Sequence, residues 1–86
     1  MSNRRRLNRR MIESNLAEAG EEIERLRKLA ADGSLHEGFL QVGLLHAYFH
    51  LNFAWNTRYL PTLRHKTMTQ EEFDQWGKYP TEIEEL

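Results

Sequence analysis

Two histidines four residues apart are the side chains of this sequence whose chemistry is easiest to name. On a helix, this spacing would point the rings of His46 and His50 in the same direction, where both could bind one metal ion such as zinc. Two ligands do not complete a site, and Ala47 stands where zinc proteases carry a glutamate. A third ligand would have to come from His36, His65, a glutamate of the preceding helix or a second subunit.

We therefore predict no bound metal and no cofactor, and we interpret the two histidines as hydrogen-bonded groups in a packed interface. A change in their charge state would make assembly pH-sensitive. The sequence contains no cysteine nucleophile and no glycine-rich phosphate loop, and its serines fall in a tail, an exposed helix and a helix cap. The protein is predicted not to be an enzyme.

A second group of side chains combines apolar rings with polar tips. It consists of Tyr48, Asn52, Trp55, Asn56 and Tyr59, on one side of the same stretch. Tyrosine and tryptophan are enriched at the centres of protein interfaces, and buried amides require hydrogen-bond partners. These residues are predicted to bind a protein partner. Packing within the protomer or dimer and binding of a small ligand are the alternatives.

The first ten residues carry five arginines and no acidic residue: Arg4, Arg5, Arg6, Arg9 and Arg10. Arginines at a helix N-terminus oppose the helix dipole, so helix stability does not explain them. Such an arm can contact phosphates or an acidic partner, whereas a solubilising tail is the simpler interpretation. From residue 67 onward, six acidic residues accompany Lys78 alone, which argues against nucleic acid as the partner.

One helix over residues 34–60 is predicted to position the histidines and the aromatic side chains. Ser34 and Glu37 have the spacing of a capping box, and Pro61 ends the helix. Apolar or amphipathic groups point in almost every direction, which is typical of the central helix of a bundle. A strip of small residues would admit a neighbouring helix: Gly43, Ala47 and Ala54.

A helix over residues 11–31 is predicted to pack against this long helix. Its apolar positions alternate in steps of four and three, and its glutamates are expected to face solvent. This seam consists of Ile12, Leu16, Ala19, Ile23, Leu26 and Ala30. The turn formed by Asp32, Gly33 and Ser34 is short, so the two helices should be antiparallel.

The remaining residues are predicted to form a linker over residues 62–67, a short helix over 70–76 and an acidic segment over 77–86. Thr69 and Glu72 form a second capping box at the start of that helix. Apart from the basic arm, residues 1–10, the chain is expected to be one helical domain over residues 11–86. Its 86 residues make a marginal core, which favours association with a second copy.

These patterns predict an all-α fold: a long antiparallel helical hairpin plus a short C-terminal helix, dimerising into a four-helix-like bundle. No secretory signal or membrane span is expected, and the absence of cysteine is compatible with the cytoplasm. The predicted function is that of a small non-catalytic interaction, adaptor or regulatory protein that forms a homodimer. The alternatives are a nucleic-acid-associated regulator that uses the arginine arm and a metal-binding bundle that uses His46 and His50.

Overall fold

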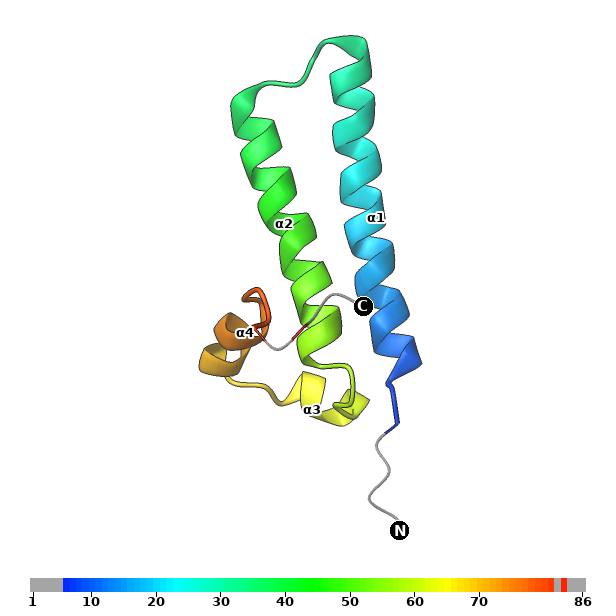
Figure 1. The fold of residues 1–86 in the computed structure, drawn as a ribbon, viewed down its shortest axis with the longest axis vertical. Helices are drawn as coiled ribbons and strands as arrows, with labels where there is room; N and C mark the ends of the chain where they lie inside the picture. Colours follow the sequence, from blue (N-terminus) through cyan, green and yellow to red (C-terminus); the bar gives the residue numbers. More distant parts are fainter. Residues whose placement is uncertain (1–5, 82, 84–86) are drawn as a thin grey trace.

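The computed structural model describes residues 6–81 and residue 83 of the chain. These residues form four helices and no strand: α1 (Arg9–Asp32), α2 (Glu37–Asn56), α3 (Thr62–Lys66) and α4 (Gln70–Trp76). The helices α1 and α2 form an antiparallel hairpin, and α3 and α4 lie near its open end, away from the α1–α2 connection (Figure 1). The predicted all-helical class and the hairpin are confirmed. Residues 82 and 84–86 of the predicted acidic segment lie outside the described residues.

The helix α1 begins at Arg9, two residues earlier than predicted, and Asn8 is its N-cap. Its Oδ1 accepts a hydrogen bond from the Met11 N–H at 3.2 Å, which caps the helix. Its backbone N–H donates to the Arg58 carbonyl at 2.7 Å, and its Nδ2 donates to the Leu60 carbonyl at 2.8 Å. These bonds join the start of α1 to the segment after α2. The last two arginines of the predicted arm therefore lie in the first turn of α1.

The connection between α1 and α2 uses Gly33 as predicted but not the predicted capping box. Gly33 adopts the left-handed conformation, with φ 80°, and ends α1. The Ser34 N–H donates to the Leu29 carbonyl at 2.9 Å, so it is not available to the Glu37 carboxylate. The helix α2 begins three residues later than predicted, and His36 occupies the N-cap without a side-chain hydrogen bond. The predicted capping box of residues 34 and 37 is therefore wrong.

The helix α2 also ends earlier than predicted, at Asn56 rather than at Leu60. The Thr57 hydroxyl donates to the Phe53 carbonyl at 2.6 Å, and the Leu60 N–H donates to the Thr57 carbonyl at 2.9 Å, which turns the chain. Pro61 then serves as the N-cap of α3, which occupies most of the predicted linker. The linker predicted over residues 62–67 therefore contains a short helix, which the sequence analysis did not predict.

The strip of small residues on α2 packs against α1. Gly43, Ala47 and Ala54 are all buried. A Cβ atom at Gly43 would lie 2.7 Å from a methyl carbon of Leu26, which shows how closely the two helices approach. This predicted contact is confirmed.

The face of α1 that meets α2 is rotated from the predicted seam. The buried residues of α1 are Asn15, Ala19 and Leu26. Leu16 and Ile23 remain 49% exposed, so the predicted seam is wrong at these positions. The physical reason is that Asn15 and Glu22 contact the two histidines of α2, which turns the apolar edge of α1 toward solvent.

The helix α4 folds back onto α2. Both hydrogen bonds of the predicted capping box at its start are present. The ring of Phe73 lies 4.7 Å from that of Phe49, and the ring of Trp76 lies 5.9 Å from that of Phe53. This aromatic cluster anchors the C-terminal part of the chain on the outer side of the hairpin. None of the described helices has the combination of length and hydropathy that a bilayer span requires.

Candidate functional site

The two histidines of α2 form a polar cluster with two side chains of α1. His50 Nδ1 lies 2.9 Å from Asn15 Oδ1, and His46 Nδ1 lies 3.2 Å from Glu22 Oε1. The two Nε2 atoms are 3.1 Å apart. We call these four residues the histidine cluster. It connects the hairpin helices through polar side chains beside the strip of small residues.

Hydrogen bonding fixes the tautomers of both rings. Asn15 Nδ2 donates to the Met11 carbonyl at 3.0 Å, which leaves Asn15 Oδ1 as the acceptor for His50. The Glu22 carboxylate also only accepts, so both histidines carry hydrogen on Nδ1. Two neutral rings would then turn the lone pairs of Nε2 toward each other.

The surroundings of the histidine cluster favour the neutral form of His50 and the ionised form of Glu22. Burial lowers the pKa of His50, as does the nearby ring of His46, whereas Glu18 acts in the other direction. The hydrogen bond from Arg25 lowers the pKa of Glu22, and the contact with His46 lowers it further. Glu22 is therefore held as a carboxylate, ready to accept the hydrogen on His46 Nδ1.

The other histidines do not join the histidine cluster. His36 is exposed at the start of α2, where it stacks on Phe39 with ring centroids 3.8 Å apart. His65 lies in α3, with its ring 6.0 Å from that of Phe53. In the part of the chain that the structure describes, no group of three or more histidine, cysteine or acidic side chains is arranged to hold a metal ion.

His65 is a buried imidazole in the aromatic cluster. Its exposed fraction is 7%, and among the described residues neither ring nitrogen has a hydrogen-bond partner within ordinary geometry. Burial lowers the pKa of His65, and the Leu60 backbone acts more weakly in the opposite direction. The folded protein therefore favours the neutral form of this side chain.

Acidification is expected to destabilise the fold through His65. Its folded pKa lies below the unfolded value of about 6.5, so the unfolded chain takes up a proton first. The contribution of neutral His65 to stability is fully present above that value and falls as the pH decreases toward the folded pKa. Urea denaturation at pH 7.5 and pH 5.5 measures this loss. The variant His65→Leu should lose less stability between these two pH values than the wild type, and an equal loss in both proteins would contradict the assignment.

Two of the five predicted partner-binding residues hold the segment that follows α4. Asn52 Nδ2 donates to the Gly77 carbonyl at 2.9 Å. Asn56 Nδ2 donates to the carbonyls of Trp76 at 2.7 Å and Lys78 at 2.8 Å. These amides satisfy backbone carbonyls at the end of α4, so their role within the chain is structural.

The other three predicted partner-binding residues lie in different surroundings. Tyr48 is 57% exposed. The Arg58 guanidinium lies 3.8 Å from the centre of the Trp55 ring and 4.8 Å from that of Tyr59. The structure thus divides the predicted group into a structural pair, an arginine-covered pair and an exposed tyrosine.

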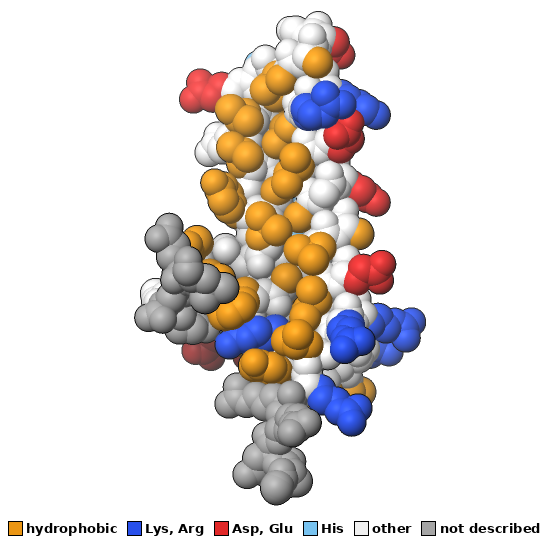
Figure 2. Space-filling model, turned by 45° about the vertical axis from the view of Figure 1, so that its right-hand side comes forward, with side chains coloured by type: hydrophobic (Ala, Val, Ile, Leu, Met, Phe, Trp, Pro, Cys, Tyr) orange, Lys and Arg blue, Asp and Glu red, His pale blue; other side chains and the backbone are white. Residues whose placement is uncertain are grey.

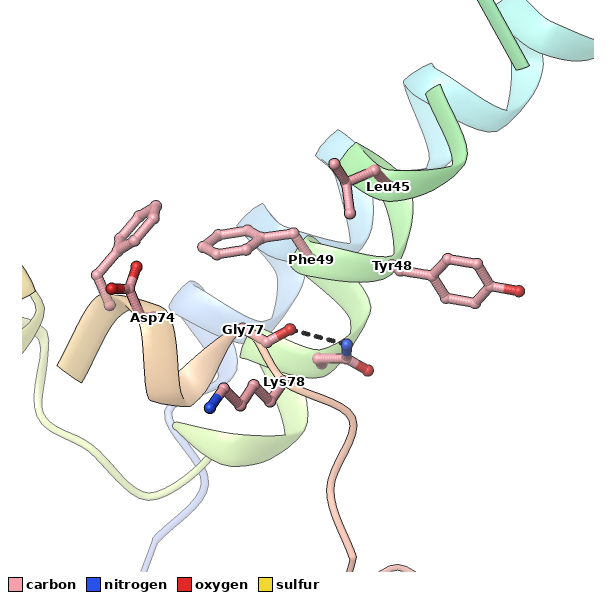
Figure 3. A pocket seen from close by; sticks show the side chains of 8 residues that line it. Leu45, Tyr48, Phe49, Asp74, Gly77 and Lys78 are labelled. Atoms are coloured by element: carbon pink, nitrogen blue, oxygen red, sulfur yellow. Dashed lines mark hydrogen bonds between the residues drawn. The ribbon is translucent and has the colours of Figure 1, made fainter. Parts of the chain in front are cut away.

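A groove of about 330 Å³ runs between α2 and the end of α4. Leu45, Tyr48 and Phe49 line it on the α2 side, with Phe49 pointing toward α4, whereas Asp74 and Lys78 place opposite charges on the α4 side (Figure 3). The hydrogen bond from Asn52 to Gly77 crosses one end of the groove (Figure 3). An apolar floor with a few polar groups at the rim is suited to an inserted apolar side chain.

A larger apolar surface lies along the hairpin itself. Figure 2 shows hydrophobic side chains gathered in a band over the two long helices. Helical spacing places five large exposed residues of α1 and α2 on one side of the hairpin, and we call them the apolar face: Leu16, Ile23, Leu40, Leu44 and Leu51. Their exposed fractions range from 38% to 49%, so each presents a substantial part of its side chain to solvent.

The apolar face and the histidine cluster lie on opposite sides of the contact between α1 and α2. On α2, the small residues that face α1 separate the angular positions of the three leucines from those of His46 and His50. The two surfaces are therefore independent of each other. The predicted seam does not identify Asn15 and Glu22 as residues that contact the histidines of α2. They nevertheless lie seven residues apart on the helical face that carries Leu26.

Three arginines of the predicted basic arm lie within the described residues. Arg6, Arg9 and Arg10 are exposed near the start of α1. Arg4 and Arg5 lie outside the described residues. The described part of the arm therefore presents positive charge at one end of the hairpin.

Comparison with known proteins gives no relative from which a function could be transferred. No protein-family model matches the chain, and no curated protein or solved structure matches it either. The arrangement of its own side chains is therefore the basis for the function inferred below.

Proposed function

We propose that the protein is a small non-catalytic interaction protein that acts as a homodimer, in which the apolar faces of two hairpins pack into a four-helix bundle. The exposed apolar face is the observation that carries this proposal. The α2–α4 groove lies on another side of α2, so each protomer of the dimer would still present it to a protein partner. The predicted cytoplasmic location is part of the same proposal.

The spacing of the apolar face on α1 supports a second copy as the occupant. Leu16 and Ile23 lie four and three residues from Gly20, on either side of it. On α2, two leucines lie three and four residues from Ala47: Leu44 and Leu51. Each helix therefore shows nearly the same apolar pattern when it is read in either direction.

The centres of these two patterns lie at the same level of the hairpin. The contacts of His46 and His50 with α1 bracket this level, since Gly20 lies between Asn15 and Glu22. A two-fold axis at this level would place each helix antiparallel to its own copy. The leucine and isoleucine side chains of one protomer would then meet those of the second copy. Self-complementarity of this kind is what a two-fold interface requires.

Charged side chains at the edge of α1 fit the same arrangement. Glu13 and Arg27 are both exposed, and each lies seven residues from Gly20. The two-fold axis would bring Glu13 of one protomer near Arg27 of the second copy, which pairs opposite charges across the interface. The same axis would place the two arginine arms at opposite ends of the bundle. This geometry does not favour a nucleic acid gripped by both arms together.

The test is the solution mass of the full chain, measured by light scattering during size exclusion at low and high salt. The wild type is expected to be a dimer under both conditions, because apolar contacts resist salt. The double variant Leu16→Glu/Ile23→Glu is expected to be a monomer, since it would bury four uncompensated carboxylates per dimer.

A matched control carries the same charges on the outer side of α2. Val42 and Leu45 are 64% and 70% exposed, and they do not belong to the apolar face. The variant Val42→Glu/Leu45→Glu should keep the mass of a dimer. A monomeric wild type, or a dimer that survives substitution of residues 16 and 23, would overturn the proposal.

A further inference from the structure

The geometry of the histidine cluster points to a further site, and we infer that His46 and His50 together bind one divalent transition-metal ion through their Nε2 atoms. Copper and zinc are the ions that imidazole ligands suit. Both ligands come from one chain, so this inference does not depend on the proposed dimer. The remaining coordination positions would be filled by water or by an external ligand.

The separation of the two nitrogens fits a shared ion. Two nitrogen ligands that lie about 2.0–2.1 Å from one ion, at angles of about 90–110°, are roughly 2.8–3.4 Å apart. The Nε2 atoms of His46 and His50 are 3.1 Å apart. The ring centroids are 4.8 Å apart, with a tilt of 51°, so the rings meet at an angle instead of end to end. Two ligands that converge on one ion adopt this bent arrangement.

The partners of the two Nδ1 atoms fit the same role. Metal-binding histidines commonly donate their other ring N–H to a carboxylate or a carbonyl, which fixes the tautomer and the ring orientation. Here the Glu22 carboxylate accepts from His46, and the Asn15 carbonyl accepts from His50. These contacts leave both Nε2 lone pairs free to bind an ion. A bound cation would relieve the repulsion between these two lone pairs.

The site is open enough for an ion to enter. The His46 side chain is 51% exposed, whereas the Glu22 side chain that supports it is 14% exposed. Glu18 lies close enough to His50 to act on its charge state, so a carboxylate adds negative potential nearby. The supporting Glu22 is thus held in the hairpin, while the ring of His46 is open to solvent.

The experiment is a calorimetric titration of Zn²⁺ and Cu²⁺, each alone, into the full chain made without a histidine tag. We expect one ion per chain. Replacement of either ligand, His46→Gln or His50→Gln, should lower the affinity at least tenfold. Glu22→Ala should lower it about tenfold, because a supporting group is lost while both ligands remain.

Two matched variants separate the site from general effects of charge and fold. His36→Gln removes an exposed histidine outside the histidine cluster, and Glu24→Ala removes a glutamate that pairs with Arg27 as Glu22 pairs with Arg25. Both should bind like the wild type. Absence of binding by the wild type, or equal losses in the controls, would overturn the inference.

A spectroscopic measurement covers the case in which a ligand variant fails to fold. Long-range ¹H–¹⁵N spectra of the wild type should show hydrogen on Nδ1 of both rings and, on addition of Zn²⁺, a shift of the two Nε2 signals. An Nε2 signal that stays unchanged for either His46 or His50 would count against the site.

Discussion

Replacement of Phe53 by alanine is expected to lower the free energy of unfolding by about 3–5 kcal/mol. Phe53 is 5% exposed, and its ring lies where α2, α3 and α4 meet. Four rings surround it at centroid distances of 5.2–6.1 Å: Phe49, His65, Phe73 and Trp76. Small domains have about 5–15 kcal/mol of stability in total, so this loss is a large fraction of it. Urea denaturation followed by circular dichroism measures the change.

The matched control is Val42→Ala on the same helix. Val42 is 64% exposed, so its truncation should change the free energy of unfolding by less than about 0.5 kcal/mol. All proteins must be compared at one concentration, because dimerisation would make the apparent stability depend on it. If Phe53→Ala were no more harmful than Val42→Ala, the aromatic cluster would not be the core of this end of the molecule.

Replacement of Gly43 by valine is expected to lower the free energy of unfolding by about 3 kcal/mol, the upper end for overpacking of a core. Even a Cβ atom at Gly43 would lie 2.7–2.9 Å from three carbon atoms of Leu26. Leu26 is buried, with an exposed fraction of 6%, and it has little room to move. The added side chain must therefore push α1 and α2 apart. Thermal or urea denaturation measures the loss.

A compensating substitution tests this explanation directly. Leu26→Ala alone leaves a cavity and is expected to cost about 2–5 kcal/mol. In the double variant Leu26→Ala/Gly43→Val, the three carbons added on α2 replace the three removed from α1. The loss in free energy of unfolding of the double variant should therefore be smaller than the sum of the two single losses by at least about 1 kcal/mol. Strictly additive losses would mean that the two side chains do not compete for the same space.

Some features of the fold were predictable because short stretches of sequence determine them. The left-handed Gly33, the capping box at the start of α4 and the strip of small residues on α2 each depend on neighbouring residues or on helical spacing alone. The packing of α4 on α2 was predictable because Phe73 and Trp76 are its large apolar residues. These features all follow from local chemistry.

The features that differ from prediction depend on contacts between distant segments. The turn after α2 is held by Asn8, which donates to carbonyl groups fifty or more residues away. The rotation of α1 depends on Asn15 and Glu22 meeting the histidines of α2. An a/d pattern identifies apolar residues but does not reveal whether they face the neighbouring helix or a further partner.

The candidate sites were predictable only in part for the same reason. The spacing of His46 and His50 identifies the pair, whereas their hydrogen-bond partners on α1 appear only in three dimensions. The amide groups of Asn52 and Asn56 are recognisable as groups that need partners, but the sequence does not reveal that the segment after α4 supplies them.

The hydrogen bonds of Asn8 have a consequence for the order in which the molecule assembles. The α1/α2 hairpin forms across a short connection, so little chain entropy is lost in closing it. The bond from Asn8 to the Leu60 carbonyl spans fifty-two residues, and it becomes favourable only once the hairpin has brought its two ends together. The hairpin is therefore suited to be the folding nucleus, and the open end is the part that completes last. On unfolding, the same end would open first and release α3 before the hairpin separates.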